Sequence, residues 1–178
     1  AALDAALERD PSNLQLLTLA WRLGREPVFE PFVVDGREFA AQNRDFGTDV
    51  DTALLLDQAV ARIFSDGSSL YYYHGLTRAN TPVGARRASF LQPLPDAYLL
   101  KVRILKPDGR VVVPSEFREG QGAINLSDVE PGDLVEEEYV AHVEATGASR
   151  DGHLPPYIYR FADPDRAFGL SEYVLLVP

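Results

Sequence analysis

The fold follows from residues 126–143, which read LSDVEPGDLVEEEYVAHV. Pro131 holds φ at about −65° and Gly132 accepts a positive φ, so this pair predicts a tight turn that leads into a strand. Side chains of a strand alternate between its two faces. The core face is expected to carry Val135, Tyr139, Ala141, Val143 and Ala145, and the solvent face Glu136, Glu138, His142 and Glu144.

Length, charge and cysteine content exclude several functions. A chain of 178 residues that is 46% hydrophobic is long enough to bury a sizeable core. Its 17 basic and 27 acidic residues give a net charge of −10, so we expect no nucleic-acid partner. No apolar run approaches the ~18 residues of a membrane span, so we expect no membrane insertion. The absence of cysteine excludes a thiol nucleophile and a thiolate metal site.

The first 52 residues predict helix followed by a connector. Residues 1–24 have helical periodicity, broken at Asp10-Pro11-Ser12-Asn13, where Pro11 or Ser12 is expected at the start of a second helix. This break resembles the junction between two tetratricopeptide repeats, although any helical hairpin has a similar pattern. Residues 25–52 are irregular, and four phenylalanines are expected to pack on the domain beneath them: Phe29, Phe32, Phe39 and Phe46.

Residues 53–178 predict a mainly β domain. Asp66-Gly67 and Asp108-Gly109 are strong hairpin signals between apolar runs, and Asn80–Gly84 is expected to be a loop. Strands are expected at residues 54–64, 70–77, 98–105, 110–113, 123–126, 134–143, 157–161 and 171–177. No helical pattern separates them, so we predict an antiparallel β-sandwich with a short N-terminal helical segment.

Several phrases occur in a characteristic order over residues 50–178. They are Leu55-Leu56-Asp57, Asp66-Gly67-Ser68, the strand with His74, Thr81-x-x-Gly84, Pro107-Asp108-Gly109, Val129-Glu130-Pro131-Gly132-Asp133 with Glu138-Tyr139, and Val174-Leu175-Leu176-Val177-Pro178. Together they resemble a bacterial domain of unknown function. That domain lies directly upstream of transglutaminase-like, peptidase-related domains in large secreted or envelope-associated proteins.

The resemblance implies a non-catalytic accessory module in a periplasmic, secreted or envelope-associated protein, often preceded by tetratricopeptide repeats. Its implied partner is the downstream transglutaminase-like domain or another protein, and no cofactor is implied. The Cys-His-Asp catalytic domain is not in this chain, so we expect no enzyme activity. The family's domain continues past the position of Pro178. We therefore expect an incomplete sheet, in which the strand Tyr173–Val177 pairs with the N-terminal connector or with a second molecule, that is, by self-association.

Carbohydrate or peptide binding is the alternative function, with Tyr71, Tyr73 and His74 as candidate ligand-binding residues. Alternation places Tyr71 and Tyr73 on one face of their strand and Tyr72 on the other. Exposed aromatic residues on a strand bind sugars or extended peptides, whereas buried ones stabilise cross-strand pairs. A groove lined by Tyr71 and Tyr73 would favour binding.

A cryptic hydrolase is the third candidate function, and the acidic face of the long strand raises the question of a metal site. A Ser-His-acid triad would have to use His74, His142 or His153, and no serine lies in a Gly-x-Ser-x-Gly motif. A histidine within hydrogen-bonding distance of a serine or carboxylate in a cleft would favour hydrolysis. Glu136, Glu138 and His142 share a face, but ~13 Å separates Glu138 from His142 along a strand. We therefore predict no metal site unless a neighbouring strand contributes a ligand.

Overall fold

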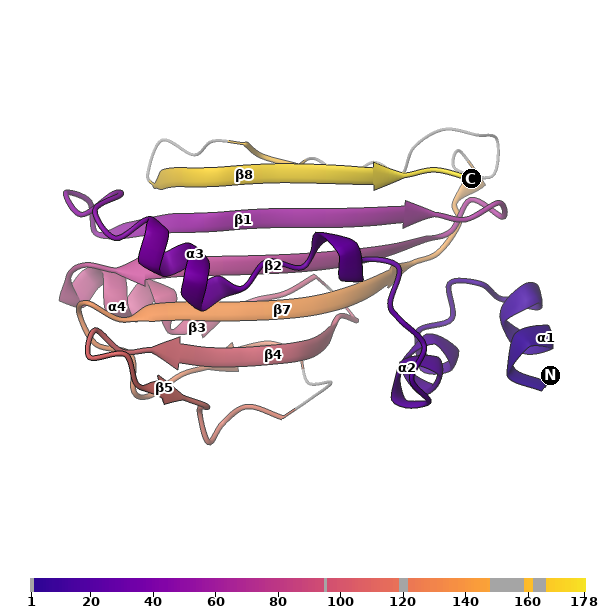
Figure 1. Cartoon of the computed structure of the whole chain (residues 1–178), viewed down its shortest axis with the longest axis horizontal. Helices are drawn as coiled ribbons and strands as arrows, with labels where there is room; N and C mark the ends of the chain where they lie inside the picture. Colours follow the sequence, from indigo (N-terminus) through magenta and orange to yellow (C-terminus); the bar gives the residue numbers. More distant parts are fainter. Residues whose placement is uncertain (1, 95, 119–121, 148–158, 162–165) are drawn as a thin grey trace.

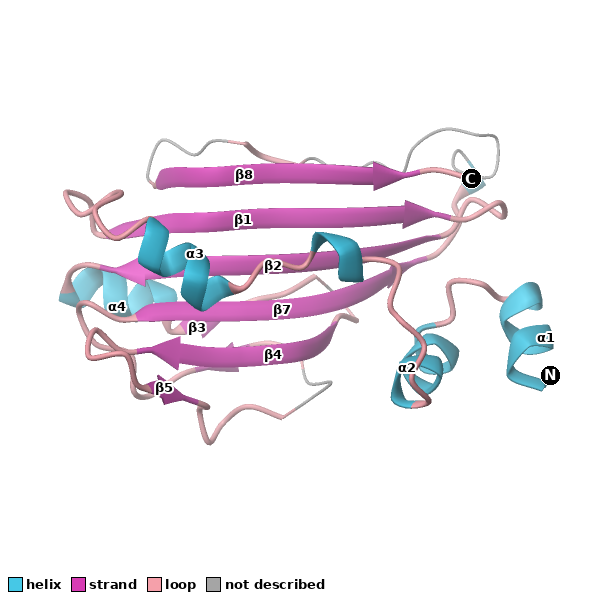
Figure 2. Ribbon diagram, in the orientation of Figure 1, coloured by secondary structure: helices cyan, strands magenta, loops and turns pink. Residues whose placement is uncertain are grey.

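The computed structural model describes residues 2–94, 96–118, 122–147, 159–161 and 166–178. It is mainly β, as predicted, with a six-stranded sheet, a two-stranded sheet and short helices (Figures 1 and 2). The elements are α1 (Ala2–Arg9), α2 (Leu14–Arg22), η1 (Glu30–Phe32), α3 (Gly36–Gln42), β1 (Thr52–Ile63), β2 (Ser69–Ala79), α4 (Pro82–Ala88), β3 (Phe90–Leu91), β4 (Tyr98–Leu105), β5 (Val111–Val112), β6 (Ile124–Asn125), β7 (Leu134–Val143) and β8 (Ala167–Leu176). In the part of the chain that is described, no helix combines the length and apolar character needed to cross a membrane.

The large sheet is mixed, whereas the sequence predicted a mostly antiparallel arrangement. Its strand order is β5-β4-β7-β2-β1-β8, and β8 runs parallel to β1 while the other pairs are antiparallel. The connection between Val143 and Ala167 is long enough for the crossover that parallel strands need. The second sheet consists only of the short strands β3 and β6. A sandwich of two extended sheets is therefore not confirmed.

The predicted turns are present, and their glycines adopt positive φ angles. Asp133 N–H donates to the Glu130 carbonyl (3.1 Å) across the turn that precedes β7. In the two hairpins, aspartate Oδ1 accepts a backbone N–H two residues later: Asp66 from Ser68 (2.9 Å) and Asp108 from Arg110 (3.0 Å). The φ values are 82° at Gly67, 87° at Gly109 and 96° at Gly132.

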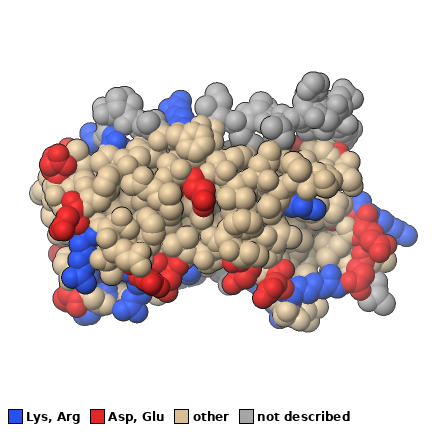
Figure 3. Space-filling view, turned by 45° about the horizontal axis from the view of Figure 1, so that its top comes forward, with Lys and Arg blue, Asp and Glu red and all other residues tan. Residues whose placement is uncertain are grey.

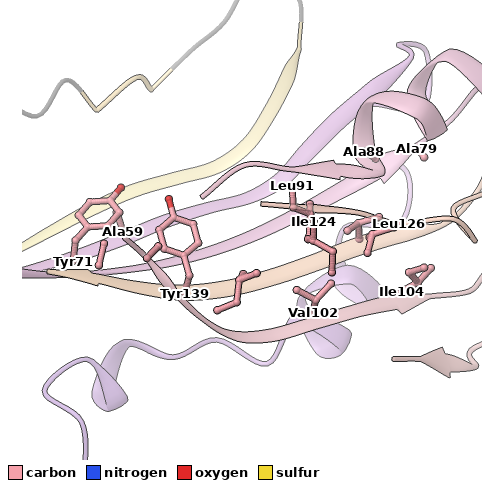
Figure 4. Packing of buried hydrophobic residues seen from close by; sticks show 14 of the residues in the cluster. Ala59, Tyr71, Ala79, Ala88, Leu91, Val102, Ile104, Ile124, Leu126 and Tyr139 are labelled. Atoms are coloured by element: carbon pink, nitrogen blue, oxygen red, sulfur yellow. The ribbon is translucent and has the colours of Figure 1, made fainter. Parts of the chain in front are cut away.

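Two bulges decide which side chains share a face of the large sheet. The β1–β2 register shifts at Leu55 and the β4–β7 register shifts at Leu100, and each shift reverses the alternation. We call one side the connector face because η1 and α3 cross it; its core includes Leu56, Val60, Leu70, Tyr72 and Leu76. We call the other side the tyrosine face; α4, β3 and β6 pack there, over Ala59, Tyr71, Val102, Ile104 and Tyr139 (Figure 4).

The connector covers the face of β7 that the sequence predicted to be solvated. Phe29 stacks on Tyr72 with ring centroids 4.2 Å apart and planes 6° apart. The other three connector phenylalanines, Phe32, Phe39 and Phe46, pack against the core, as predicted. Glu136 and Glu138 are consequently buried. Their predicted exposure was wrong because alternation alone does not show what crosses a sheet.

Local predictions outside the large sheet were partly wrong. The cap of α2 is Asn13 and not Pro11 or Ser12; its Oδ1 accepts the Leu16 N–H (3.0 Å). Helix α4 replaces the predicted loop, because Thr81 caps it and Pro82 suits a first helical position. Residues 157–158 of the strand predicted at 157–161 lie outside the described residues, and residues 159–161 are not a strand.

Candidate functional site

A buried ion network lies on the connector face where β2, β7 and β4 run side by side. It consists of His74, Glu136, Glu138, Lys101 and Arg103. His74 Nε2 donates to Glu136 Oε1 (3.0 Å) and lies 3.7 Å from Glu138 Oε1. Arg103 pairs with Glu136 through Nε and Nη2, and Lys101 Nζ pairs with Glu138. One guanidinium and one ammonium thus balance the two carboxylates.

The surroundings of Glu136 keep its carboxylate ionised. Burial alone raises the pKa of Glu136, but the hydrogen bonds from His74 and Arg103 outweigh it and lower the pKa to about 2. Gly36, the first residue of α3, covers the carboxylate so closely that a Cβ there would lie 2.4 Å from Glu136 Oε1. The connector therefore covers Glu136 from above.

The network contains the residue types of a metal site, but its two carboxylates are already neutralised by cationic side chains. One ligand atom from each of His74, Glu136 and Glu138 lies within 4.8 Å of the others. Both carboxylates already pair with cationic side chains, which a metal ion would have to displace. Sequence reasoning found the two glutamates but paired them with His142. The missing partner was a cross-strand neighbour, because His74 is in register with Glu138.

His142 takes part in a separate contact at the end of β7. Its Nε2 lies 3.0 Å from Ser12 Oγ, and it lines a pocket with Asp10, Asn13 and Glu144. A serine–histidine contact of this kind was the expected sign of a hydrolase. Ser12, however, is only 1% exposed, so its hydroxyl is not accessible to a substrate. The contact links the N-terminal helices to the sheet.

The three candidate ligand-binding residues lie on different faces. Tyr71 and Tyr73 belong to the tyrosine face, where they pack against Tyr139 with centroids 6.4 and 5.0 Å away, whereas His74 lies on the connector face. Burial, followed by neighbouring tyrosines, raises the pKa of Tyr71. The tyrosines thus form part of the core on their face, and they do not form a common surface with His74.

Strand β8 forms one border of the large sheet. Among the described residues no strand lies beside its outer edge. Leu170 and Leu175 are 42% and 37% exposed, and the only charged residue of the strand, Glu172, accepts a hydrogen bond from Gln58 (2.8 Å). In the view of Figure 3 uncharged surface predominates, with an acidic side chain near its middle and most other charged side chains toward the rim. Edge strands normally carry lysine, proline or a bulge against unwanted pairing, and β8 carries none of these.

An aromatic pocket lies between α2, the connector and β4. It has a volume of about 420 Å³, and its walls include Trp21, Phe29 and Tyr98. Lys101 and Glu138 of the ion network line the same pocket. Its size and its mixture of aromatic and charged side chains are typical of small-molecule sites.

Comparisons with known proteins do not identify the chain. No protein family and no curated protein matches it. Among solved structures, one described as a "putative protease" from Parabacteroides distasonis is similar, with 14% sequence identity and a TM-score of 0.45. The match covers 54% of this chain and 24% of that chain. A likeness this distant carries no argument about activity.

Proposed function

We propose that the chain is a non-catalytic accessory module of a bacterial envelope or secreted protein with a transglutaminase-like domain. In this proposal the module binds a segment of that domain, or of another protein, as an added strand along β8. The outer edge of β8, beside which no described strand lies, is the observation that supports it most. The ordered sequence phrases that resemble the transglutaminase-associated domain supply the context.

The chemistry of the edge suits strand addition. A ten-residue edge strand offers a row of backbone N–H and C=O groups to an incoming strand. Leu170 and Leu175 add exposed apolar contacts. Glu172, the only charged residue of the strand, already accepts a hydrogen bond from Gln58. Pairing a partner with this edge would remove the aggregation risk that an open apolar edge carries.

Calorimetric titration with the separately produced transglutaminase-like domain of the same full-length protein tests this proposal. We expect saturable binding that Leu175→Lys weakens at least about tenfold, because the lysine places a charge on the edge. Val111→Lys is the matched control, since Val111 is an exposed apolar residue of β5 at the opposite border. Binding that tolerates both Leu175→Lys and Leu170→Lys would contradict the proposal.

Within the described part of the chain, no accessible serine or cysteine is hydrogen-bonded to a histidine, as the nucleophiles of serine hydrolases and transglutaminases are. The chain has no cysteine, and the hydroxyl of Ser12, which contacts His142, is buried. We expect no hydrolase or transglutaminase turnover from the chain alone. Turnover on peptide or ester substrates that disappears in His74→Ala or His142→Ala would overturn this part of the proposal.

Carbohydrate binding is a second candidate, and the aromatic pocket favours it. Trp21 lines the pocket and is the only tryptophan of the chain, so its fluorescence reports on occupancy directly. A saturable change on adding mono- or disaccharides, abolished by Tyr98→Ala and retained in Phe90→Ala, would support this function. An unchanged spectrum across such a panel would contradict it.

A further inference from the structure

A small polar cavity lies on the tyrosine face, apart from the ion network and the β8 edge. It has a volume of about 60 Å³. Strands β1, β2 and β7 contribute Thr52, Thr77 and Glu137, α4 contributes Arg87, and Arg166 precedes β8. Ala88, Phe90 and Leu91 complete the lining. Five polar side chains from separate parts of the chain therefore converge on a space that holds about two water molecules.

Two buried polar atoms of this cavity have no partner among the described residues. They are Thr52 Oγ1 and Glu137 Oε2. Buried polar atoms are nearly always hydrogen-bonded, so such a pair around one cavity indicates an occupant. Arg87 and Arg166 are exposed, and no hydrogen bond or ion pair joins either to another described residue. Among the described residues that line the cavity, two guanidinium groups face a single carboxyl group, Glu137, and this excess of cations distinguishes the site from one that only needs water.

We propose that the cavity binds a carboxylate group, held by Arg87 and Arg166 and by the Thr52 hydroxyl, while Glu137 shares a proton with it. Guanidinium groups match carboxylates in geometry and charge. Two carboxyl groups at hydrogen-bonding distance retain one proton between them. The site has a positive excess within a chain whose net charge is −10, which favours an anion.

The state of Glu137 supports this assignment. Burial raises the pKa of the Glu137 carboxyl to about 7, and Arg166 opposes the shift. The other ionisable groups that face Glu137 are Arg87 from α4 and Tyr73 from β2. A protonated Glu137 donates to the incoming carboxylate, whereas an ionised one repels it. Affinity should therefore fall roughly thirtyfold between pH 6 and pH 8.5, as the protonated fraction falls.

Titration with acetate, followed by NMR of the Thr52, Thr77 and Glu137 backbone amides, tests the proposal. Wild type should bind at pH 6 and lose affinity at pH 8.5, Glu137→Gln should bind with little pH dependence, and Arg87→Gln should lose binding. Arg86→Gln, an exposed neighbour on α4 that does not line the cavity, should behave as wild type. If Arg87→Gln does not fold, Arg166→Gln replaces it.

Three results would overturn the assignment. Equal shifts with chloride at the same ionic strength would show a general salt effect. Phosphate is bulkier than a carboxylate group and should bind more weakly. Equally tight binding of inorganic phosphate and acetate would therefore show an anion site that does not select carboxylates. The absence of a saturable shift in wild type and Glu137→Gln would mean that water fills the cavity.

A second set of titrations identifies the kind of molecule that supplies the carboxylate. Trialanine with a free C-terminus is compared with acetate, and its C-terminal amide is the control. Tighter binding of the free tripeptide upholds the site and assigns it to a chain terminus. Tighter binding of acetate upholds the site and assigns it to a small organic acid.

Discussion

His74 of β2 and Glu136 of β7 face each other diagonally across two central strands, with Nε2 3.0 Å from Oε1 and both side chains fully buried. Arg103 completes the pair from β4. The three residues connect three neighbouring strands beneath the connector. Removing one charged side chain from such a group leaves its partner buried and unpaired. The free energy lost in this way exceeds the net stability that the intact ion pair provides.

Glu136→Gln is therefore expected to destabilise the fold by about 3–5 kcal/mol. Its matched control is Glu130→Gln, because Glu130 also pairs with a cation, Lys106 (3.4 Å), but is 76% exposed. We expect the control to cost less than about 1 kcal/mol. Urea unfolding of both variants measures the difference, and equal losses would show that burial does not set the cost.

The pKa values of Glu136 and Glu137 are shifted in opposite directions, so the two residues should give opposite pH dependences of stability. The fold lowers the pKa of Glu136 from 4.5 to about 2, so its ionised carboxylate stabilises the fold fully above pH 4.5. This contribution is lost as the pH falls toward 2. The raised pKa of Glu137, about 7, means that stability falls as the pH rises from 4.5 to 7.

Glu137→Gln should accordingly be more stable than wild type at pH 8, by up to about 3 kcal/mol. The two proteins should be similar at pH 4, where both side chains are neutral. Urea unfolding at the two pH values measures this. A variant that is less stable than wild type at pH 8 would mean that the ionised carboxylate is satisfied in the fold.

Gly132→Val is expected to cost at least about 1 kcal/mol, because a β-branched residue is strained at positive φ. A Cβ at this position would also lie 3.0 Å from Pro107 Cγ. Gly122→Val is the control, since a Cβ there meets nothing within 4 Å. Thermal melts of both variants decide the matter, and equal melting temperatures would contradict the strained turn.

Gly169→Ala tests the parallel pairing of β8 with β1. A Cβ on Gly169 would lie 2.5 Å from the Leu55 carbonyl oxygen, which is rigid backbone at the β1 bulge. We expect β8 to separate locally from β1 and its amides to exchange faster with solvent. Gly147→Ala, which meets nothing within 4 Å, should not change exchange in β8. Unchanged exchange in Gly169→Ala would contradict the pairing.

The sequence predicts strands and turns well where local signals decide them. The bounds of β4 and β7 and the positive φ of Gly132 follow from alternation and from turn chemistry. The parallel direction of β8 does not follow, because a long connection allows either direction. Helix α4 was missed because Thr81 and Pro82 suit a turn as well as a helix start.

The candidate site depends on features that no local pattern reveals. Bulges at Leu55 and Leu100 reverse the alternation of β1 and β4, so counting by twos misplaces side chains beyond them. The ion network also needs a cross-strand register that brings His74 opposite Glu138. Burial of Glu136 depends on Gly36, which is a hundred residues away in the chain.

Amide hydrogen exchange along β8 tests the central claim most directly. In the free chain the N–H groups that point away from β1 should exchange fast, because no described strand covers them. When the transglutaminase-like domain binds, these amides should slow by roughly tenfold or more, as expected for new ladder hydrogen bonds. Binding that leaves the outward amides of β8 unchanged and protects residues elsewhere would contradict strand addition at this edge.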